Sequence, residues 1–156
     1  MIRVATTADH DAVWAILEPV IRDGETYTLD RDMTREQALA YWFAPGHTVL
    51  VTEDRLGTYY LRRNQAGGGS HVANCGYMTA PSARGKGLAR AMCAHSLEEA
   101  RRRGFRAMQF NFVVTTNTRA IALWESFGFV TVGRLPRAFS HPTAGQVDAL
   151  VMYLHL

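Results

Sequence analysis

The chain has 156 residues, of which 47% are hydrophobic and 20% charged, and its formal net charge at pH 7 is +3. This balance is typical of a globular protein that buries a full core in one domain, here residues 1–156, and no apolar run approaches the ~20 residues of a membrane span. The positive charge is too small to indicate a nucleic-acid surface, so neither nucleic acid nor membrane is an expected partner.

The N-terminal segment predicts a strand and then a helix. Met1–Thr6 has β character and lacks the charged-then-apolar pattern of a secretory signal, which favours a cytoplasmic protein. Residues 9–22 place apolar side chains at helical spacing, and Gly24 is expected to end this helix.

A second, short helix is predicted further along the chain. Residues 34–37, Thr-Arg-Glu-Gln, have the form of a capping box, and Pro45-Gly46 should stop the helix that it opens. The connection between the two helices, Glu25 to Asp32, is expected to be exposed, and it carries Tyr27.

The hydrophobic period then changes from helical to alternating. Residues 48–53, 56–63 and 72–79 are rich in β-forming residues, and a glycine-rich stretch at 65–70 separates the last two runs. These three runs predict an antiparallel meander.

The C-terminal half predicts two helices and three strands. The expected order is a helix at 88–103, a strand at 105–114, a helix at 117–127 ending at Gly128, and strands at 129–135 and 147–154 joined by a loop with Pro136, His141, Pro142 and Gly145. The strand at 72–79, the helix at 88–103 and the strand at 105–114 form one βαβ unit, whose crossover should be right-handed.

Residues 83–90, Ala-Arg-Gly-Lys-Gly-Leu-Ala-Arg, predict an anion site. A helix that begins after a strand offers unpaired N–H groups and a positive dipole end, and glycine lets a phosphate approach the backbone. The stretch is not a P-loop, because Lys86 is followed by Gly87 rather than by a hydroxyl that holds magnesium. A dinucleotide fingerprint also fails, because Arg90 replaces its third glycine and the strand at 105–114 has no acidic residue.

Two motifs resemble those of the GNAT N-acetyltransferases. Arg84-Gly85-Lys86-Gly87-Leu88-Ala89 matches the family signature Arg/Gln-x-x-Gly-x-Gly/Ala, and residues 117–129 resemble its Asn-x-x-Ala-x-x-Leu-Tyr-x-x-x-Gly-Phe helix. The order of the predicted elements agrees as well. The resemblance implies an α/β (α+β) GNAT fold: a mixed, mostly antiparallel sheet of about seven strands, splayed at the acetyl-CoA site and flanked by about four helices.

The resemblance implies that acetyl-CoA is the cosubstrate and that its pyrophosphate lies on the backbone N–H groups of Gly85 to Arg90. In that family the strand before this loop parts from its neighbour, and its main chain pairs with pantetheine. The residues that are expected to bind the cosubstrate are Tyr77, Met78, Thr79, Arg84, Gly85, Lys86, Gly87, Leu88, Ala89, Arg90, Asn117 and Trp124.

Trp124 stands where many family members have a tyrosine that protonates the leaving thiolate. An indole N–H donates a hydrogen bond but is no acid near neutral pH, so packing, against pantetheine for example, is its expected role. A thiol with a pKa of about 8.5 leaves tolerably as a thiolate without help. A working enzyme is therefore expected, and a catalytically silent CoA-binding regulatory module of the same fold is the alternative.

Asparagines are the candidates for the acceptor side. On the strand at 105–114 an apolar face is expected from Met108, Phe110, Phe112 and Val114, so Gln109 and Asn111 should face a cleft. Asn111 is equally well explained as a satisfied structural amide. Asn117 is expected both to cap its helix and to donate to the acetyl carbonyl.

The expected catalytic residues are thus Asn117 and Asn111, and the expected substrate-binding residues are Asn74, Asn111 and Tyr27. The trio of asparagines resembles a family branch that acetylates small amino-acid-type amines. The sequence shows no clear base, although Glu25, Glu53, His71 and Asp148 are conceivable ones. Without a base, an α-amine of pKa about 7.7–8.0 is an easier acceptor than a lysine amine of about 10.4.

The predicted activity is acetyl transfer from acetyl-CoA to the amine of a small molecule, such as an amino acid, by direct attack in a ternary complex. A protein N-terminal amine is an alternative acceptor. The oligomeric state is open, with a homodimer as one option because family members are often dimers. Cys75 and Cys93 are expected to be reduced and structural, and the six histidines show no spacing of metal ligands, so no metal is expected.

Overall fold

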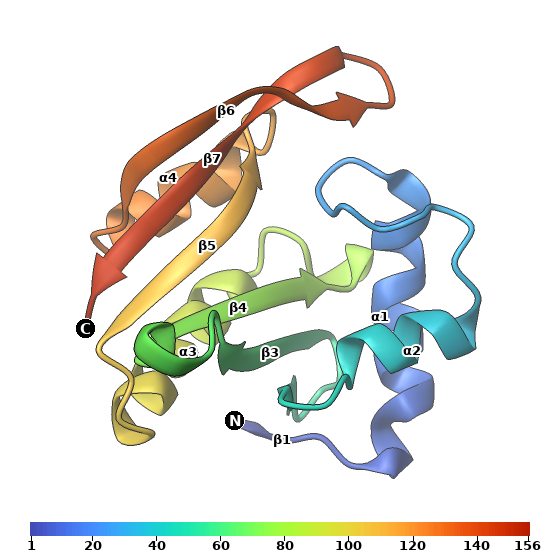
Figure 1. Ribbon diagram of the computed structural model, residues 1–156. Coiled ribbons are helices and arrows are strands. Elements are labelled where there is room, and N and C mark those ends of the chain that lie inside the picture. The colour runs from blue at the N-terminus through green and yellow to red at the C-terminus, as the bar shows by residue number, and fades with distance from the viewer.

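The computed structural model describes residues 1–156 as one seven-stranded sheet with helices on both faces (Figure 1). The strands follow the order β1-β2-β3-β4-β5-β7-β6, and every neighbouring pair is antiparallel except β4 and β5. The predicted fold class is confirmed. The strands are β1 (Ile2–Val4), β2 (Thr48–Thr52), β3 (Gly57–Arg63), β4 (Val72–Thr79), β5 (Ala107–Val114), β6 (Val130–His141) and β7 (Gly145–His155).

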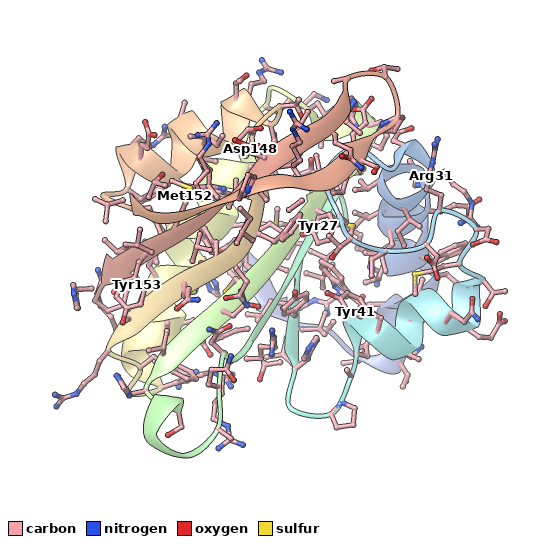
Figure 2. The ribbon with its side chains drawn as sticks, turned by 45° about the horizontal axis from the view of Figure 1, so that its top comes forward. Tyr27, Arg31, Tyr41, Asp148, Met152 and Tyr153 are labelled. Atoms are coloured by element: carbon pink, nitrogen blue, oxygen red, sulfur yellow. The ribbon has the colours of Figure 1, made fainter.

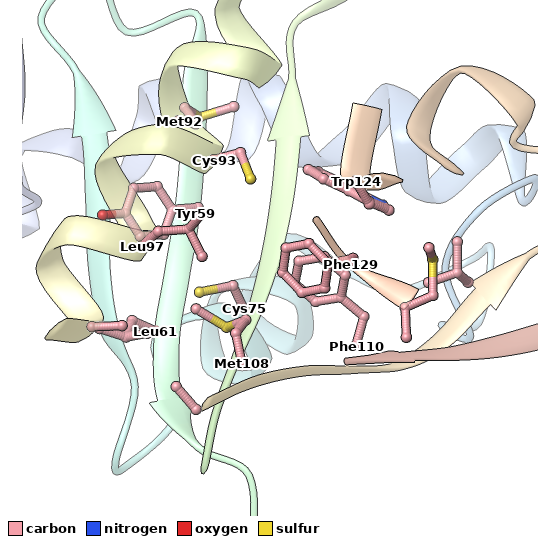
Figure 3. Close-up of a cluster of buried hydrophobic side chains, with 14 of the residues drawn as sticks. Tyr59, Leu61, Cys75, Met92, Cys93, Leu97, Met108, Phe110, Trp124 and Phe129 are labelled. Carbon is pink, nitrogen blue, oxygen red and sulfur yellow. The ribbon is translucent and has the colours of Figure 1, made fainter. Parts of the chain in front are cut away.

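Four α-helices cover the sheet in two layers. They are α1 (His10–Asp23), α2 (Arg35–Trp42), α3 (Leu88–Arg102) and α4 (Thr118–Ser126). Side chains alternate along a strand, so neighbouring residues serve different layers. On β3, Tyr59 packs in the core beneath α3 and α4, shown in Figure 3, whereas Tyr60 packs in the core beneath α1 and α2. None of the helices combines the length and the apolar character that crossing a bilayer requires.

Local signals fix the end of the first helix and the start of the second as predicted. Gly24 ends α1 with a left-handed backbone (φ +65°), a conformation that costs other residues more. At the start of α2 the capping box forms, because the Thr34 hydroxyl accepts from the Gln37 N–H and the Gln37 side chain accepts from the Thr34 N–H.

The two parallel strands β4 and β5 part soon after they meet. Only Val72 with Ala107 and Ala73 with Met108 are paired, and beyond them the strands diverge, as Figure 1 shows for the green and yellow arrows. We call this divergence, beyond Ala73 on β4 and Met108 on β5, the splay.

The predicted long loop at 136–146 is wrong. β6 runs on to His141 and β7 begins at Gly145, so a short turn joins two long strands. Pro136 is tolerated because β6 is an edge strand and the pairing with β7 is irregular between Leu135 and Phe139.

The predicted apolar face of β5 is interrupted. The pairing of β5 with β7 shifts between Phe110 and Val113, which breaks the alternation of side chains. Val113 and Val114 are both buried, whereas Phe112 is only half-buried and packs against Phe139 of β6, with 6.2 Å between ring centroids.

Asp9 supports the N-terminal corner of the fold. Its side chain is 1% exposed and accepts two hydrogen bonds of 2.8 Å from Arg3 and one of 2.9 Å from the Thr6 N–H. The Arg3 guanidinium and the Thr6 N–H together hold the pKa of Asp9 well below its ordinary value. The folded state therefore favours the ionised carboxylate.

We expect Asp9→Asn to lower the free energy of unfolding at pH 7 by about 1.5–3 kcal/mol, the range for hydrogen bonds to a charged group. Because folding depresses this pKa, the stabilisation is fully present above pH ~4 and is lost as the pH falls through the folded-state value. The melting-temperature gap between wild type and variant should therefore shrink below pH ~4. Asp11→Asn is the control, since Asp11 is 86% exposed beside Arg35; an equal loss in both variants would contradict the role of Asp9.

Candidate functional site

A row of free backbone donors lies where β4 leads into α3. Gly85 and Gly87 both have positive φ (+76° and +78°), and Gly87 is the N-cap of α3. The N–H groups of Gly85 and of residues 87–90 have no partner in the protein, and the N–H of Lys86 has only a long bond of 3.3 Å to the Ala83 carbonyl. Residues 85–90 therefore present a cradle for an anion.

The glycines shape this cradle through their backbone. A Cβ built on Gly85 or Gly87 would meet no atom within 4 Å, so close packing does not explain glycine at either position. The left-handed conformation does, and the space where a Cβ would stand is left open in front of the cradle.

Two of the three cations near the cradle are engaged elsewhere. The Arg84 guanidinium lies 3.7 Å from the Asp23 carboxylate at the end of α1. Arg90 donates to the Ser126 hydroxyl at 3.3 Å and lies over the Phe127 ring. Lys86 has no partner. These exposed side chains add less than the fixed row of N–H groups.

The main chain of β4 presents a second set of donors. The Asn64 N–H donates to the Val72 carbonyl and the Ala80 N–H to the Leu56 carbonyl, so even-numbered residues of β4 turn their main-chain groups toward β3. Odd-numbered residues then face the splay, which leaves the N–H groups of Tyr77 and Thr79 free there. Met78 differs from the expectation that it binds the cosubstrate. Its main chain faces β3 and its side chain is buried beneath α1 and α2.

Tyr27 lies closer to β4 than the sequence suggests. Its hydroxyl donates to the Tyr77 carbonyl at 2.8 Å and its ring packs near Trp42, so the connection of 25–32 is tied to the splayed strand rather than simply exposed. Figure 2 shows Tyr27 beside β4. Burial raises the pKa of Tyr27 well above its ordinary value, so the phenol stays neutral.

Trp124 packs on the α3 and α4 side of the splay. It is 8% exposed, and its ring centroid lies 5.1 Å from that of Tyr77 and 5.0 Å from that of Phe110 (Figure 3). No protein group accepts from its indole N–H, yet no buried polar side-chain atom lacks a partner, so this N–H reaches solvent. Trp124 therefore packs in the core as expected, and its indole N–H is free to donate a hydrogen bond.

Asn74 and Asn111 are both held by protein groups. Asn74 accepts from the Arg62 Nε at 3.1 Å and donates to the Gln109 carbonyl at 2.9 Å, just beyond the last paired residues of β4 and β5. Asn111 accepts from the Gln109 side chain at 2.9 Å and donates to Asn64 at 2.6 Å. These bonds favour the alternative of a satisfied structural amide.

Asn117 does not cap its helix through its side chain. It occupies the N-cap position of α4, but its side chain accepts no bond from the first turn. The main chain alone closes the turn, because the Ile121 N–H donates to the Asn117 carbonyl at 3.1 Å. The expected cap is wrong, and the half-buried amide is left free.

Of the conceivable bases, Asp148 is engaged by protein groups. The Arg137 N–H and then the Arg134 guanidinium hold the pKa of Asp148 below its ordinary value, which weakens this carboxylate as a base. Burial raises the pKa of Cys75 and of Cys93 to about 12, so both thiols are unreactive, as expected. No group of His, Cys, Asp and Glu side chains is arranged to hold a metal ion.

The sequence does not predict a cluster of Tyr41, His47 and Tyr60 on the α1 and α2 face. The Tyr60 ring lies across Gly76 of β4, where an added Cβ would come within 2.6–2.9 Å of it. The Tyr41 hydroxyl lies 3.3 Å from that of Tyr60, and His47 stacks on the Tyr60 ring. The available signal was Gly76 itself, because an isolated glycine in a strand often marks a close approach.

Comparisons with known proteins agree on one family. The model of the acetyltransferase (GNAT) family matches residues 12–129. N-acetyltransferase aca1 of Schizosaccharomyces pombe is 31% identical over 157 aligned residues, which cover 86% of this chain and 74% of that protein.

Two solved structures resemble the whole chain. A GCN5-related N-acetyltransferase from Kribbella flavida has a TM-score of 0.92 at 42% identity, covering 100% of this chain and 97% of that one. The structure of yncA from Salmonella typhimurium with its cofactor acetyl-CoA has a TM-score of 0.86 at 26% identity, covering 100% of this chain and 93% of that one.

Proposed function

Given that the chain belongs to the GNAT family and is an acetyl-CoA-dependent N-acetyltransferase, we propose that it acetylates the α-amine of a small amino-acid-type molecule. The amine attacks directly while both substrates are bound. One observation carries this proposal: the groups around the splay are amides, free backbone N–H groups and neutral phenols, and the Asp148 carboxylate is engaged by Arg134 and Arg137.

The chain's own groups have separate tasks. The bound thioester supplies the acetyl group and a thiol leaving group. Residues 85–90 hold the pyrophosphate, and the N–H groups of Tyr77 and Thr79 pair with the pantetheine arm. The bond from Tyr27 to the Tyr77 carbonyl fixes that part of β4 in place. The free amide of Asn117 and a β4 N–H donate to the acetyl oxygen as negative charge builds on it.

The acceptor must lose its proton to water before it attacks. At pH 7 about a tenth of an α-amine of pKa 7.7–8.0 is neutral, against less than one in a thousand for a lysine amine of about 10.4. Without a side-chain base, the enzyme depends on this neutral fraction. An α-amine is therefore favoured over a lysine side chain as the acceptor.

The test is thiol release from acetyl-CoA at pH 7 with three acceptors: free α-amino acids, Nα-acetyl-lysine and a short peptide with a free N-terminus. We expect kcat/KM for the best amino acid to exceed that for the lysine side chain, because its α-amine has the lower pKa. A preference for the lysine or for the peptide would contradict the proposal. Tight CoA binding with no turnover of any amine would instead support a silent binding module.

A further inference from the structure

Arg62, at the end of β3, is a cation that no acid balances. Its side chain is half-buried and takes part in no ion pair. Its Nε donates to Asn74 at 3.1 Å and its Nη1 makes a long contact of 3.4 Å with the Arg63 carbonyl. A guanidinium carries five N–H donors in a planar fork that matches a carboxylate. Arg62 therefore keeps unused donors, including both on Nη2.

These donors border a hollow of about 280 Å³. Its walls are Pro45–His47, before β2, and residues 62–66, at the end of β3 and in the turn that follows; we call it the polar hollow. That volume suits a small polar molecule or part of one rather than an extended apolar ligand.

The polar hollow is connected to the splay through hydrogen-bonded side chains. Asn74 links the Arg62 guanidinium to the Gln109 carbonyl of β5. Asn64, which lines the hollow, accepts a hydrogen bond from Asn111, which also lies on β5. Both links reach β5 at the inner end of the splay, on the face opposite to α3 and α4. A molecule in the hollow therefore lies at the end of β3, the strand paired with β4, and these side chains link it to β5.

The other titratable groups around Arg62 are neutral or positive. Burial lowers the pKa of His47, the Arg62 charge lowers it further, and the bond to the Trp42 carbonyl raises it in part. His47 is thus neutral at pH 7, with Nδ1 donating to Trp42 at 2.9 Å. Burial and the nearby Tyr41 raise the pKa of Tyr60 far above neutrality. Arg63 is a second, exposed cation. The polar hollow attracts an anion.

We propose that Arg62 binds a carboxylate of the acceptor, so that the enzyme selects amines that are also acids. This inference rests on the proposed function and narrows it to carboxylated amines. A fork of charge-assisted bonds to Arg62 supplies affinity and fixes the acceptor against β4. Arg62 makes no contact with the atoms that react, so its effect is on acceptor binding.

The test compares acids with their uncharged amides. Leucine with leucinamide probes the α-carboxylate, and glutamate with glutamine probes a distal one. Wild type should prefer the acid in at least one pair by about 10- to 100-fold in kcat/KM, chiefly through KM, as expected for a hydrogen-bonded charge of about 1.5–3 kcal/mol. Arg62→Gln should abolish that preference, and Arg62→Lys should restore part of it.

Arg106→Gln is the matched control, because Arg106 is exposed before β5 and the change removes the same charge. All variants should bind CoA as wild type does, and the melting temperature of each checks its fold. No preference in either pair, or a preference that survives Arg62→Gln, would overturn the proposal.

Calorimetry separates this proposal from the proposed function. The amino acid is titrated into the protein saturated with CoA, where no turnover occurs. Loss of measurable binding in Arg62→Gln, with retention in Arg106→Gln, supports the carboxylate site even if no small amine is acetylated. Equal binding to both variants refutes it even if the enzyme is active.

Discussion

Gly87→Val is expected to weaken the binding of CoA by about 10- to 100-fold, whereas Gly104→Val is not. At position 87 the added side chain stands in front of the free N–H groups of residues 85–90 and displaces the pyrophosphate from them. The loss of one charge-assisted hydrogen bond, about 1.5–3 kcal/mol, accounts for a change of this size. Calorimetric titration with CoA measures it.

Gly104 is a close match for Gly87. It follows the other end of α3, its φ is +86° against +78°, and a Cβ at either residue would meet no atom within 4 Å. Both variants therefore have the same backbone strain, on the order of 1–3 kcal/mol. Equal loss of CoA affinity in the two would show that strain, and not blockage of the cradle, is responsible.

The side chains of the cradle should matter less than its main chain. Arg84→Gln and Lys86→Gln each remove an exposed charge, which is worth about 0–1 kcal/mol, or up to about fivefold in affinity. A loss larger than that of Gly87→Val in either variant would move the principal phosphate contact from the backbone to the cation.

Trp124→Ala is expected to lower the free energy of unfolding by about 3–5 kcal/mol, because a buried aromatic ring is removed from between Tyr77 and Phe110. Trp124→Phe keeps a ring there and loses the indole N–H. We expect this second variant to retain kcat within about tenfold, since a thiol with a pKa of about 8.5 needs no acid to leave. Denaturant unfolding and thiol-release kinetics provide the two readouts.

The opposite result would give Trp124 a catalytic role. A loss in kcat of more than about 100-fold in Trp124→Phe, with the melting temperature unchanged, would equal the contribution of a general acid or of an essential donor. Trp124→Tyr then completes the series. A gain in kcat of more than about 100-fold in Trp124→Tyr would show that the wild type has no general acid at this position and that a tyrosine there can supply one.

Local signals in the sequence predict much of this fold. Gly24 and the capping box at Thr34 act within one turn of helix, so the end of α1 and the start of α2 can be predicted without tertiary structure. The long hairpin of β6 and β7 is not readable in this way, because Pro136 normally argues against a strand and is acceptable only on an edge. The bulge in β5 likewise depends on its pairing with β7.

The acceptor side of the site is set by contacts between distant parts of the chain. Asn74 meets the Gln109 carbonyl 35 residues away, and Asn111 meets Asn64 across 47 residues. The sequence marks such residues as polar and strand-borne, but it does not say whether protein groups already satisfy them. The role of Arg62 is also not predictable from the sequence, because only the fold shows that this half-buried guanidinium has no acid beside it.

The most direct test of the cosubstrate site is a titration of ¹⁵N-labelled protein with CoA, followed through the backbone amide signals. The largest shifts are expected at residues 85–90, which form the cradle, and at Tyr77 and Thr79, whose free N–H groups face the splay. Unmoved signals at these residues, with shifts confined to the polar hollow around Arg62, would contradict the proposal that the main chain holds acetyl-CoA.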